Sequence, residues 1–220
     1  EILIGLVGSE MCIRDSPKNS DLADLGTVMP NVYHTKEEMI DCVNAFYEGM
    51  VQRSKEMKRH PNYKTGENYA YLGLPPCFLI FDEYVAFFEM LGTKESVGLL
   101  SQLKKIVMLG RQAGYFLIVA CQRPDAKYFS DGIRDNFNFR VGLGRISELG
   151  YGMLFGSDVK KQFFQKRIKG RGYCDVGTSV ISEFYTPLVP KGHDFLQTIG
   201  RLAQERQTMP EQQGKEDVIE

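Results

Sequence analysis

Two adjacent carboxylates, Asp82 and Glu83, directly follow the apolar run CFLIF at positions 77–81. In nucleoside triphosphatases, a carboxylate at the end of such a strand holds magnesium, and a second one can polarise the attacking water. Acidic residues after a strand also cap the helix that follows, and the pair alone favours neither role. The surrounding sequence must therefore decide between catalysis and capping.

The phosphate-binding loop that this chemistry uses is not found at the amino end of the sequence. That loop has the order G-x-x-x-x-G-K-[ST], because its backbone N–H groups, lysine and hydroxyl hold the phosphates and magnesium. The stretch EILIGLVGSEMC begins as the strand before such a loop usually does, with an apolar run that is followed by glycines. Counted from either Gly5 or Gly8, however, the required glycine and lysine are not in place.

Composition sets broad limits on the chain. Its 220 residues suffice for one sizeable core, and 28 acidic against 27 basic residues neither require nor exclude a nucleic-acid partner. The five cysteines form no CxxC pair and the three histidines stand far apart, so we expect reduced thiols in the cytoplasm and no zinc site. No apolar stretch approaches the ~20 residues that span a bilayer.

The elements that would position the carboxylates alternate between strand and helix. The runs CFLIF and YFLIV are continuously apolar, as in parallel strands covered on both faces, and FNFRVGLG at 137–144 is expected to be a third strand. Polar residues just beyond the strands place the active edge at their carboxyl ends. GRGYCDVGTSVISEFY at 170–185 alternates and is punctuated by glycines, which predicts a β-hairpin.

Helices are expected between these strands. The first runs from Thr35 to about Arg59, where Thr35 and Glu38 form a capping box. A second follows Thr93 and ends at the glycines 110 and 114, and a short third surrounds Ile133. The apolar positions expected to face the core are Met39, Val43, Phe46 and Met50 in the first helix, and Val97, Leu100, Leu103 and Val107 in the second.

Three segments in this order and spacing, LIFDEYVAF, GRQAGYFLIVACQRPD and GIRDNFNFRVGLGRIS, resemble the motor domain of the FtsK/SpoIIIE DNA translocase family. The run from Pro17 to Leu196 is most similar to the coupling ATPases of Gram-positive integrative conjugative elements. The resemblance implies an α/β fold: part of a RecA-like P-loop ATPase, mainly a parallel sheet flanked by helices, with a C-terminal β-hairpin. We assign residues 17–200 to this motor domain and 201–220 to a polar, disordered tail.

The resemblance also implies roles for single residues. Asp82 matches the aspartate that holds magnesium, Glu83 the catalytic base and Gln122 the polar residue that senses the γ-phosphate of ATP. Arg111 resembles the arginine offered to a neighbouring subunit as a finger, which implies a homo-oligomer, namely a hexameric ring. Without the resemblance, Arg111 would be interpreted as an ordinary solvated charge.

Two sets of basic residues are candidates for binding DNA. The family places pore-facing residues after QRP, which makes Lys127 and Arg134 candidates. The second set is a run without acids, whose cations suit sequence-independent phosphate contacts or, equally, form a solvated face. Its members are Lys160, Lys161, Lys166, Arg167, Lys169 and Arg171.

The first sixteen residues do not continue the resemblance. The family has an aspartate before the pair Pro-Lys, whereas this chain has Ser16 before Pro17. GLVGSEMCIRDS resembles a translated sequencing adapter, so we expect residues 1–16 to be non-native and the phosphate-binding loop to lie upstream of them in the parent protein. Without that loop we expect the 220-residue chain to hold ATP poorly and to be inactive.

The resulting functional prediction is an ATP-dependent DNA translocase that moves DNA during conjugative transfer, with ATP and Mg²⁺ as cofactors. Relaxase and other conjugation proteins are the implied partners. The segment is expected in the cytoplasm, and the parent protein at the inner face of the membrane through an N-terminal anchor. The alternative is a non-catalytic module with a motor fold that docks the relaxosome or partner subunits.

Overall fold

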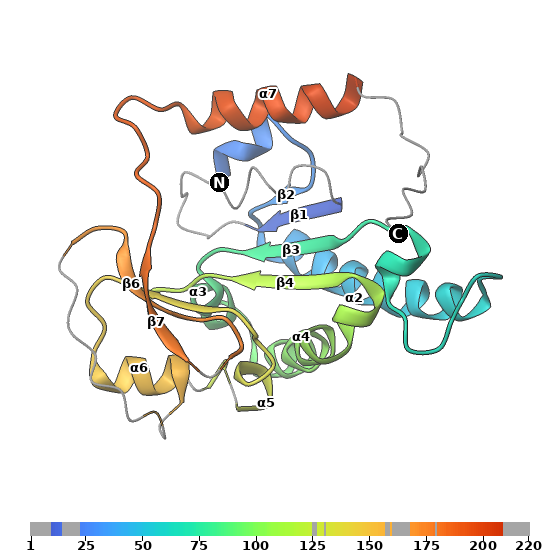
Figure 1. The fold of residues 1–220 in the computed structure, drawn as a ribbon, viewed down its shortest axis with the longest axis horizontal. Coiled ribbons are helices and arrows are strands. Elements are labelled where there is room, and N and C mark those ends of the chain that lie inside the picture. The colour runs from blue at the N-terminus through green and yellow to red at the C-terminus, as the bar shows by residue number, and fades with distance from the viewer. Residues whose placement is uncertain are drawn as a thin grey trace, which may run out of the picture.

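The structure is a computed structural model that describes residues 10–14, 23–124, 127–129, 131–156, 159, 168–178 and 180–208. Its centre is a parallel sheet with helices on both faces (Figure 1). The strand order is β2-β1-β3-β4, and the sheet confirms the predicted parallel α/β architecture. The strands are β1 (Glu10–Arg14), β2 (Val32–Tyr33), β3 (Cys77–Phe81) and β4 (Tyr115–Val119).

Strand β1 lies inside the segment 1–16 that we expected to be foreign to the protein. Its backbone pairs with β2 on one side and with β3 on the other, in parallel register from Glu10 opposite Cys77 to Arg14 opposite Phe81. These residues therefore occupy an interior position of the sheet.

Helix α2 (Lys36–Arg59) begins with the predicted capping box. The Thr35 hydroxyl accepts a hydrogen bond from the Glu38 backbone N–H, and the Glu38 carboxylate accepts one from the Thr35 backbone N–H. All four apolar residues predicted to face the core are buried, so the periodicity identified the packed face of this helix. Together with α3 (Tyr84–Glu89) and α4 (Thr93–Ala113), α2 encloses the main core on one face of the sheet.

The buried face of α4 differs from the predicted one. Leu103 is buried as predicted, but Val97 is 64% exposed, and Leu99 and Ile106, which were not predicted to face the core, are buried. The helix also continues through Gly110 instead of ending there, because Gly110 is where α4 touches β4: a Cβ at this position would collide with the carbonyl oxygen of Tyr115. The side of α4 that carries Gly110 is therefore the side that contacts β4.

The opposite face of the sheet is covered by α7 (Phe195–Thr208) and the short 3₁₀-helix η1 (Ala23–Thr27). Leu25 of η1, Ile80 of β3 and Ile199 of α7 form a second buried cluster there. Residues 201–208 are thus helical, although we had assigned them to a disordered tail; the rest of that tail lies outside the described residues.

A second, smaller sheet has the order β5-β6-β7 and is antiparallel. Its strands β6 (Arg171–Asp175) and β7 (Ile181–Tyr185) confirm the predicted hairpin. Strand β5 (Arg140–Leu143) was expected to extend the parallel sheet, but it pairs with β6 instead. Three other elements complete the described part of the fold: the 3₁₀-helix η2 (Tyr69–Leu72), α5 (Asp131–Arg134) at the predicted short helix, and α6 (Glu148–Phe155), which packs on the small sheet.

An ion pair links β5 to β6. Arg140 and Asp175 stand opposite each other in the ladder, and their side chains meet at 2.7 Å. Asp175 also accepts a hydrogen bond from the Gly177 N–H, and Arg140 donates one to the carbonyl oxygen of Leu154 in α6. The pair therefore joins two strands and a helix at a buried point.

Replacing Asp175 with alanine should destabilise the protein by about 3–5 kcal/mol, because it leaves the largely buried Arg140 guanidinium without its counter-charge. Urea unfolding would measure the change in the free energy of unfolding. The matched control is Glu205→Ala, which removes an exposed pair with Arg201 and should cost about 0.5 kcal/mol or less. Equal effects of the two changes would contradict a structural role for the buried pair.

Candidate active site at the carboxyl edge of the parallel sheet

Strands β3 and β4 end side by side. Phe81 is opposite Val119 in the ladder, and two further backbone bonds continue the pairing: Ala120 N–H to the Phe81 carbonyl at 2.8 Å and Tyr84 N–H to the Ala120 carbonyl at 3.0 Å. The arrowheads of β1, β3 and β4 all point toward the small sheet (Figure 1). The residues following both strands are therefore held together at one edge, which we call the carboxyl edge.

Glu83 and Gln122 meet at this edge. The Gln122 side-chain amide donates a hydrogen bond of 2.9 Å from Nε2 to Glu83 Oε1. Glu83 is also the N-cap residue of α3, but its side chain makes no capping hydrogen bond. The Glu83 side chain therefore does not cap α3, which was one of the two roles that the sequence left open. Its carboxylate binds Gln122 at the strand end instead.

The Glu83 backbone is in the left-handed region, with φ 46° and ψ 45°. For a residue with a Cβ, this conformation costs about 1–2 kcal/mol, and such residues concentrate at functional sites. Here the left-handed turn separates the end of β3 from the start of α3. It lets the chain turn sharply while the carboxylate stays beside Gln122.

Two titratable groups lie near this turn, the half-buried Cys121 and the buried Tyr84. Burial, and secondarily the negative charge of Glu83, raise the pKa of the Cys121 thiol to about 11. Burial also raises the pKa of the Tyr84 hydroxyl, and Cys121 adds to that effect. Both groups are consequently protonated at neutral pH, so Cys121 is not a nucleophile there.

The donors at the carboxyl edge fit a magnesium ion bound together with phosphate. Mg²⁺ commonly takes one or two carboxylates from a protein and completes its shell with water and phosphate oxygens. Asp82 and Glu83 are half-buried neighbours of this kind. Within the described part of the chain, no group of three or more His, Cys, Asp or Glu side chains could hold a metal by itself, so a caged structural ion is not indicated there.

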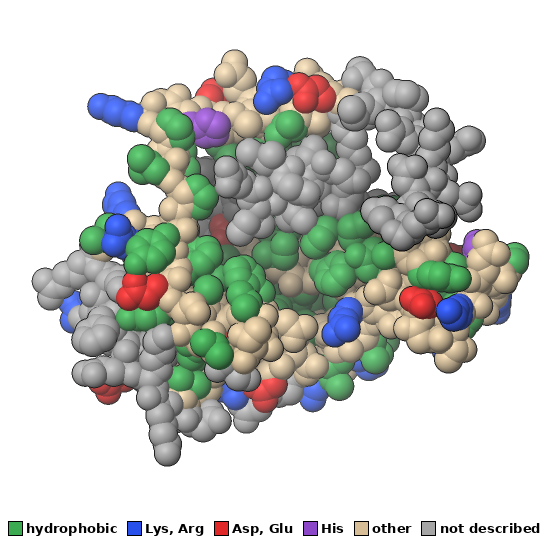
Figure 2. Space-filling view, viewed as in Figure 1, with side chains coloured by type: hydrophobic (Ala, Val, Ile, Leu, Met, Phe, Trp, Pro, Cys, Tyr) green, Lys and Arg blue, Asp and Glu red, His purple; other side chains and the backbone are tan. Residues whose placement is uncertain are grey.

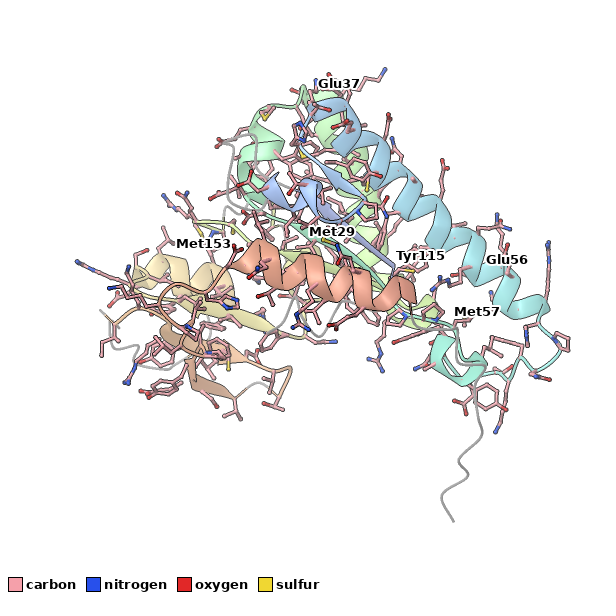
Figure 3. The ribbon with its side chains drawn as sticks, turned by 90° about the horizontal axis from the view of Figure 1, so that it is seen from above. Met29, Glu37, Glu56, Met57, Tyr115 and Met153 are labelled. Atoms are coloured by element: carbon pink, nitrogen blue, oxygen red, sulfur yellow. The ribbon has the colours of Figure 1, made fainter. Side chains whose placement is uncertain are left out.

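Arg111 lies at the other edge of the sheet. It is exposed in the last turn of α4, and β4 begins only four residues later, at Tyr115, which lies beside α2 (Figure 3). The five residues of β4, at about 3.3 Å each, separate this end from Gln122. Within one chain, Arg111 is therefore not brought to the carboxylates, whereas Glu83 and Gln122 are brought together as predicted.

Sequence reasoning missed the contacts that fix this end of α4. Arg53 donates from Nη1 to the carbonyl oxygens of Pro75 at 2.7 Å and Ala113 at 3.5 Å, and its guanidinium lies over the Tyr115 ring. Gln112 donates from its side-chain amide to the Glu67 carbonyl oxygen. An arginine or glutamine that binds carbonyl groups leaves no periodic signal in a sequence.

The candidate DNA-binding residues fall into two separate regions. Lys127 follows β4 and donates from Nζ to the Tyr128 hydroxyl at 2.9 Å, while Arg134 of α5 pairs with Asp135 at 3.1 Å. Lys169 is exposed before β6, and Arg171 places its guanidinium 4.7 Å from the centre of the Tyr185 ring. The remaining members of the predicted basic run, residues 160, 161, 166 and 167, lie outside the described residues.

The small sheet and the residues flanking it also expose large apolar side chains, and hydrophobic groups are visible at that end of the molecule in Figure 2. They include Phe139, Leu143, Val176, Val180 and Tyr185. This end of the molecule therefore exposes apolar groups as well as the cations Lys169 and Arg171.

Comparison with known proteins identifies one curated relative and several structural neighbours. The chain is 56% identical over 197 residues to the FtsK domain-containing protein YdcQ of Bacillus subtilis (strain 168), covering 89% of the chain and 40% of that protein. The chain thus spans well under half of its relative. No family model matches the sequence.

The solved structures agree on the fold at low sequence identity. The pCW3 conjugation coupling protein TcpA, solved with ATPγS, superposes with a TM-score of 0.70 at 17% identity, over 91% of this chain and 59% of TcpA. ATPases 2 and 3 of EssC from Geobacillus thermodenitrificans give a TM-score of 0.65 at 17% identity, over 95% of this chain and 41% of EssC.

Of the described helices, none is both long and apolar enough to span a membrane.

The raised pKa of Cys121 gives a test of the site's geometry. Alkylation of Cys121 by iodoacetamide should be slow at neutral pH and should accelerate up to a pH of about 11, because only the thiolate reacts. Glu83→Gln should shift this midpoint to lower pH, since it removes a negative charge that disfavours the thiolate. Peptide-resolved mass spectrometry against pH would measure both midpoints, and an unchanged midpoint would place Glu83 away from Cys121.

Proposed function

Because the chain belongs to the family of FtsK domain-containing proteins, we propose that it is part of an ATP-driven motor that moves DNA during conjugative transfer. The observation that carries this proposal is the hydrogen bond between Gln122 and Glu83, next to Asp82, where two adjacent parallel strands end. The conjugation coupling protein TcpA, with its similar fold, supports the same assignment. The motor activity is proposed for the parent protein that contains this chain.

The residues at the carboxyl edge have distinct tasks in this proposal. Asp82 holds the magnesium ion of Mg-ATP, and Glu83 orients the attacking water and takes up its proton. Gln122 fixes the Glu83 carboxylate through its amide, and its proposed task is to sense the γ-phosphate. Bound Mg-ATP supplies the phosphoryl group and the cationic charge that screens it. Neither Asp82 nor Glu83 substitutes for the phosphate-binding loop, which the 220 residues do not contain.

Arg111 acts on the site of a neighbouring copy. Its position at the opposite edge from Glu83 is what a finger supplied in trans requires, since a guanidinium stabilises charge on the transferring phosphoryl group only from close range. Met108 and Leu109 beside it are 51% and 60% exposed, and they would be covered by the neighbour. The homo-oligomer implied is a ring, for which we propose six subunits.

DNA and conjugation proteins are the proposed partners. Lys127 and Arg134 would contact DNA phosphates in the pore, and Lys169 and Arg171 would contact them from the small sheet. Phosphate contacts of this kind are independent of sequence, as movement along DNA requires. The relaxase-bound DNA strand is the proposed cargo.

Glu83→Gln should lower the rate of ATP hydrolysis by the parent protein about 10²–10⁴-fold at saturating ATP, because it removes the proton acceptor. Nucleotide affinity should remain, since the amide keeps the shape of the side chain. Steady-state hydrolysis and equilibrium ATP binding separate the two effects. Unchanged hydrolysis would remove Glu83 from the mechanism and favour a non-catalytic docking module.

Arg111→Ala should reduce hydrolysis about 10³–10⁵-fold, as expected for the loss of an arginine finger. Mixing this variant with Glu83→Gln should restore part of the activity, because at some interfaces an intact Arg111 meets an intact Glu83. The matched control is a mixture of Arg111→Ala with a Glu83→Gln, Arg111→Ala double variant, which should remain inactive. Failure of the first mixture to recover would exclude action in trans.

A further inference from the structure

Tyr84 is a buried tyrosine whose hydroxyl has no role in the mechanism above. It directly follows Glu83, is 1% exposed, and donates a hydrogen bond of 3.4 Å to the backbone carbonyl of Tyr128. The two residues are 44 positions apart. This contact joins the turn that carries Glu83 to the segment that follows β4.

Aromatic packing strengthens the same connection. The Tyr84 ring lies 4.7 Å from the Phe129 ring and 4.9 Å from the Phe88 ring, and Phe88 lies 5.5 Å from Tyr128, all between ring centres. Tyr128 is itself 3% exposed and belongs to the main core. Close-packed rings of this kind transmit displacements because the interior has few voids to absorb them.

Lys127 is on the outside of the same segment. Its side chain is exposed, and its Nζ donates a hydrogen bond of 2.9 Å to the hydroxyl of Tyr128. Residues 127–129 therefore present a cation to solvent and two aromatic rings to the core. A phosphate that contacts Lys127 would act on Tyr128 directly.

The segment after β4 is fastened to the Glu83 turn at three points. The Ala120 carbonyl accepts from the Tyr84 N–H, the Gln122 amide donates to Glu83, and the Tyr128 carbonyl accepts from the Tyr84 hydroxyl. Tyr84 contributes two of these three bonds. Residues 127–129 are therefore tied through Tyr84 to the residue next to Glu83, so a movement of this segment would change the position of the Glu83–Gln122 hydrogen bond.

We infer that Tyr84 is a positioning residue that couples a nucleic-acid phosphate at Lys127 to the Glu83 carboxylate. The inference rests on the proposed function, namely DNA contact by Lys127 and catalysis by Glu83. DNA bound at Lys127 shifts the Tyr128 carbonyl, Tyr84 follows, and the Glu83–Gln122 bond is made or released. Such coupling requires an element with two discrete arrangements, and in this inference they are the Glu83–Gln122 bond as it is made in the structure and the same bond released.

Hydrogen exchange measured by mass spectrometry tests this link in the 220-residue chain. A short DNA duplex and its single strand are the probes, and exchange is followed in the peptide around Lys127 and in the peptide covering residues 81–90. In the wild type, DNA should change exchange in both peptides. Tyr84→Phe, which keeps the ring, should retain the DNA-induced change in exchange around Lys127. In the same variant, the DNA-induced change in exchange at residues 81–90 should fall about fivefold or more, the lower end of the usual range of coupling between sites.

Two further variants separate coupling from a general loss of packing. Tyr115→Phe removes the hydroxyl of another buried tyrosine, at the opposite end of β4, and should leave both responses intact. Lys127→Gln leaves the core untouched and should abolish the response at 81–90, which keeps the test valid if Tyr84→Phe fails to fold.

Each remaining outcome counts against the inference in a distinguishable way. A response around Lys127 without one at 81–90 in the wild type would overturn the coupling but leave the DNA contact standing. A response at 81–90 that survives Tyr84→Phe would show that another route carries it. No response in either peptide would contradict the DNA contact in the proposed function, and the inference would fall with it.

Discussion

The parallel pairing of β3 with β4 is the constraint on which the candidate site depends. Five residues of each strand are in register, and the ladder is prolonged by the bonds of Ala120 and Tyr84 beyond the last strand residues. Because parallel strands end at the same edge, this pairing alone brings chain positions 82–83 and 122 together. The left-handed turn at Glu83 and its bond to Gln122 both lie at this edge.

Much of this arrangement could be predicted from local patterns. The capping box of α2 uses residues three positions apart, and the continuous apolar runs of β3 and β4 identify strands covered on both faces. Once those strands are assigned, the rule that polar groups gather at the carboxyl ends of a parallel sheet is enough to place Glu83 beside Gln122.

Contacts between distant residues could not be predicted in the same way. Helix α4 carries apolar residues on more than one side, and its buried side is the one that meets α2, α3 and the close approach of Gly110 to Tyr115. Arg140 of β5 pairs with a charge 35 positions away, and the bond from Tyr84 to Tyr128 joins segments 44 positions apart. Periodicity reports the burial of a face, but it does not report which surface covers that face.

The left-handed backbone at Glu83 lowers the stability of the fold at the position whose carboxylate the proposed function needs. Glycine adopts this conformation without steric cost, and asparagine does so more readily than glutamate. A selection of variants for thermal stability alone would therefore be expected to replace Glu83 by one of these residues and lose its carboxylate. The residue at the centre of the carboxyl edge is thus kept at the expense of the fold, and the surrounding β3–β4 pairing supplies the stability that allows it.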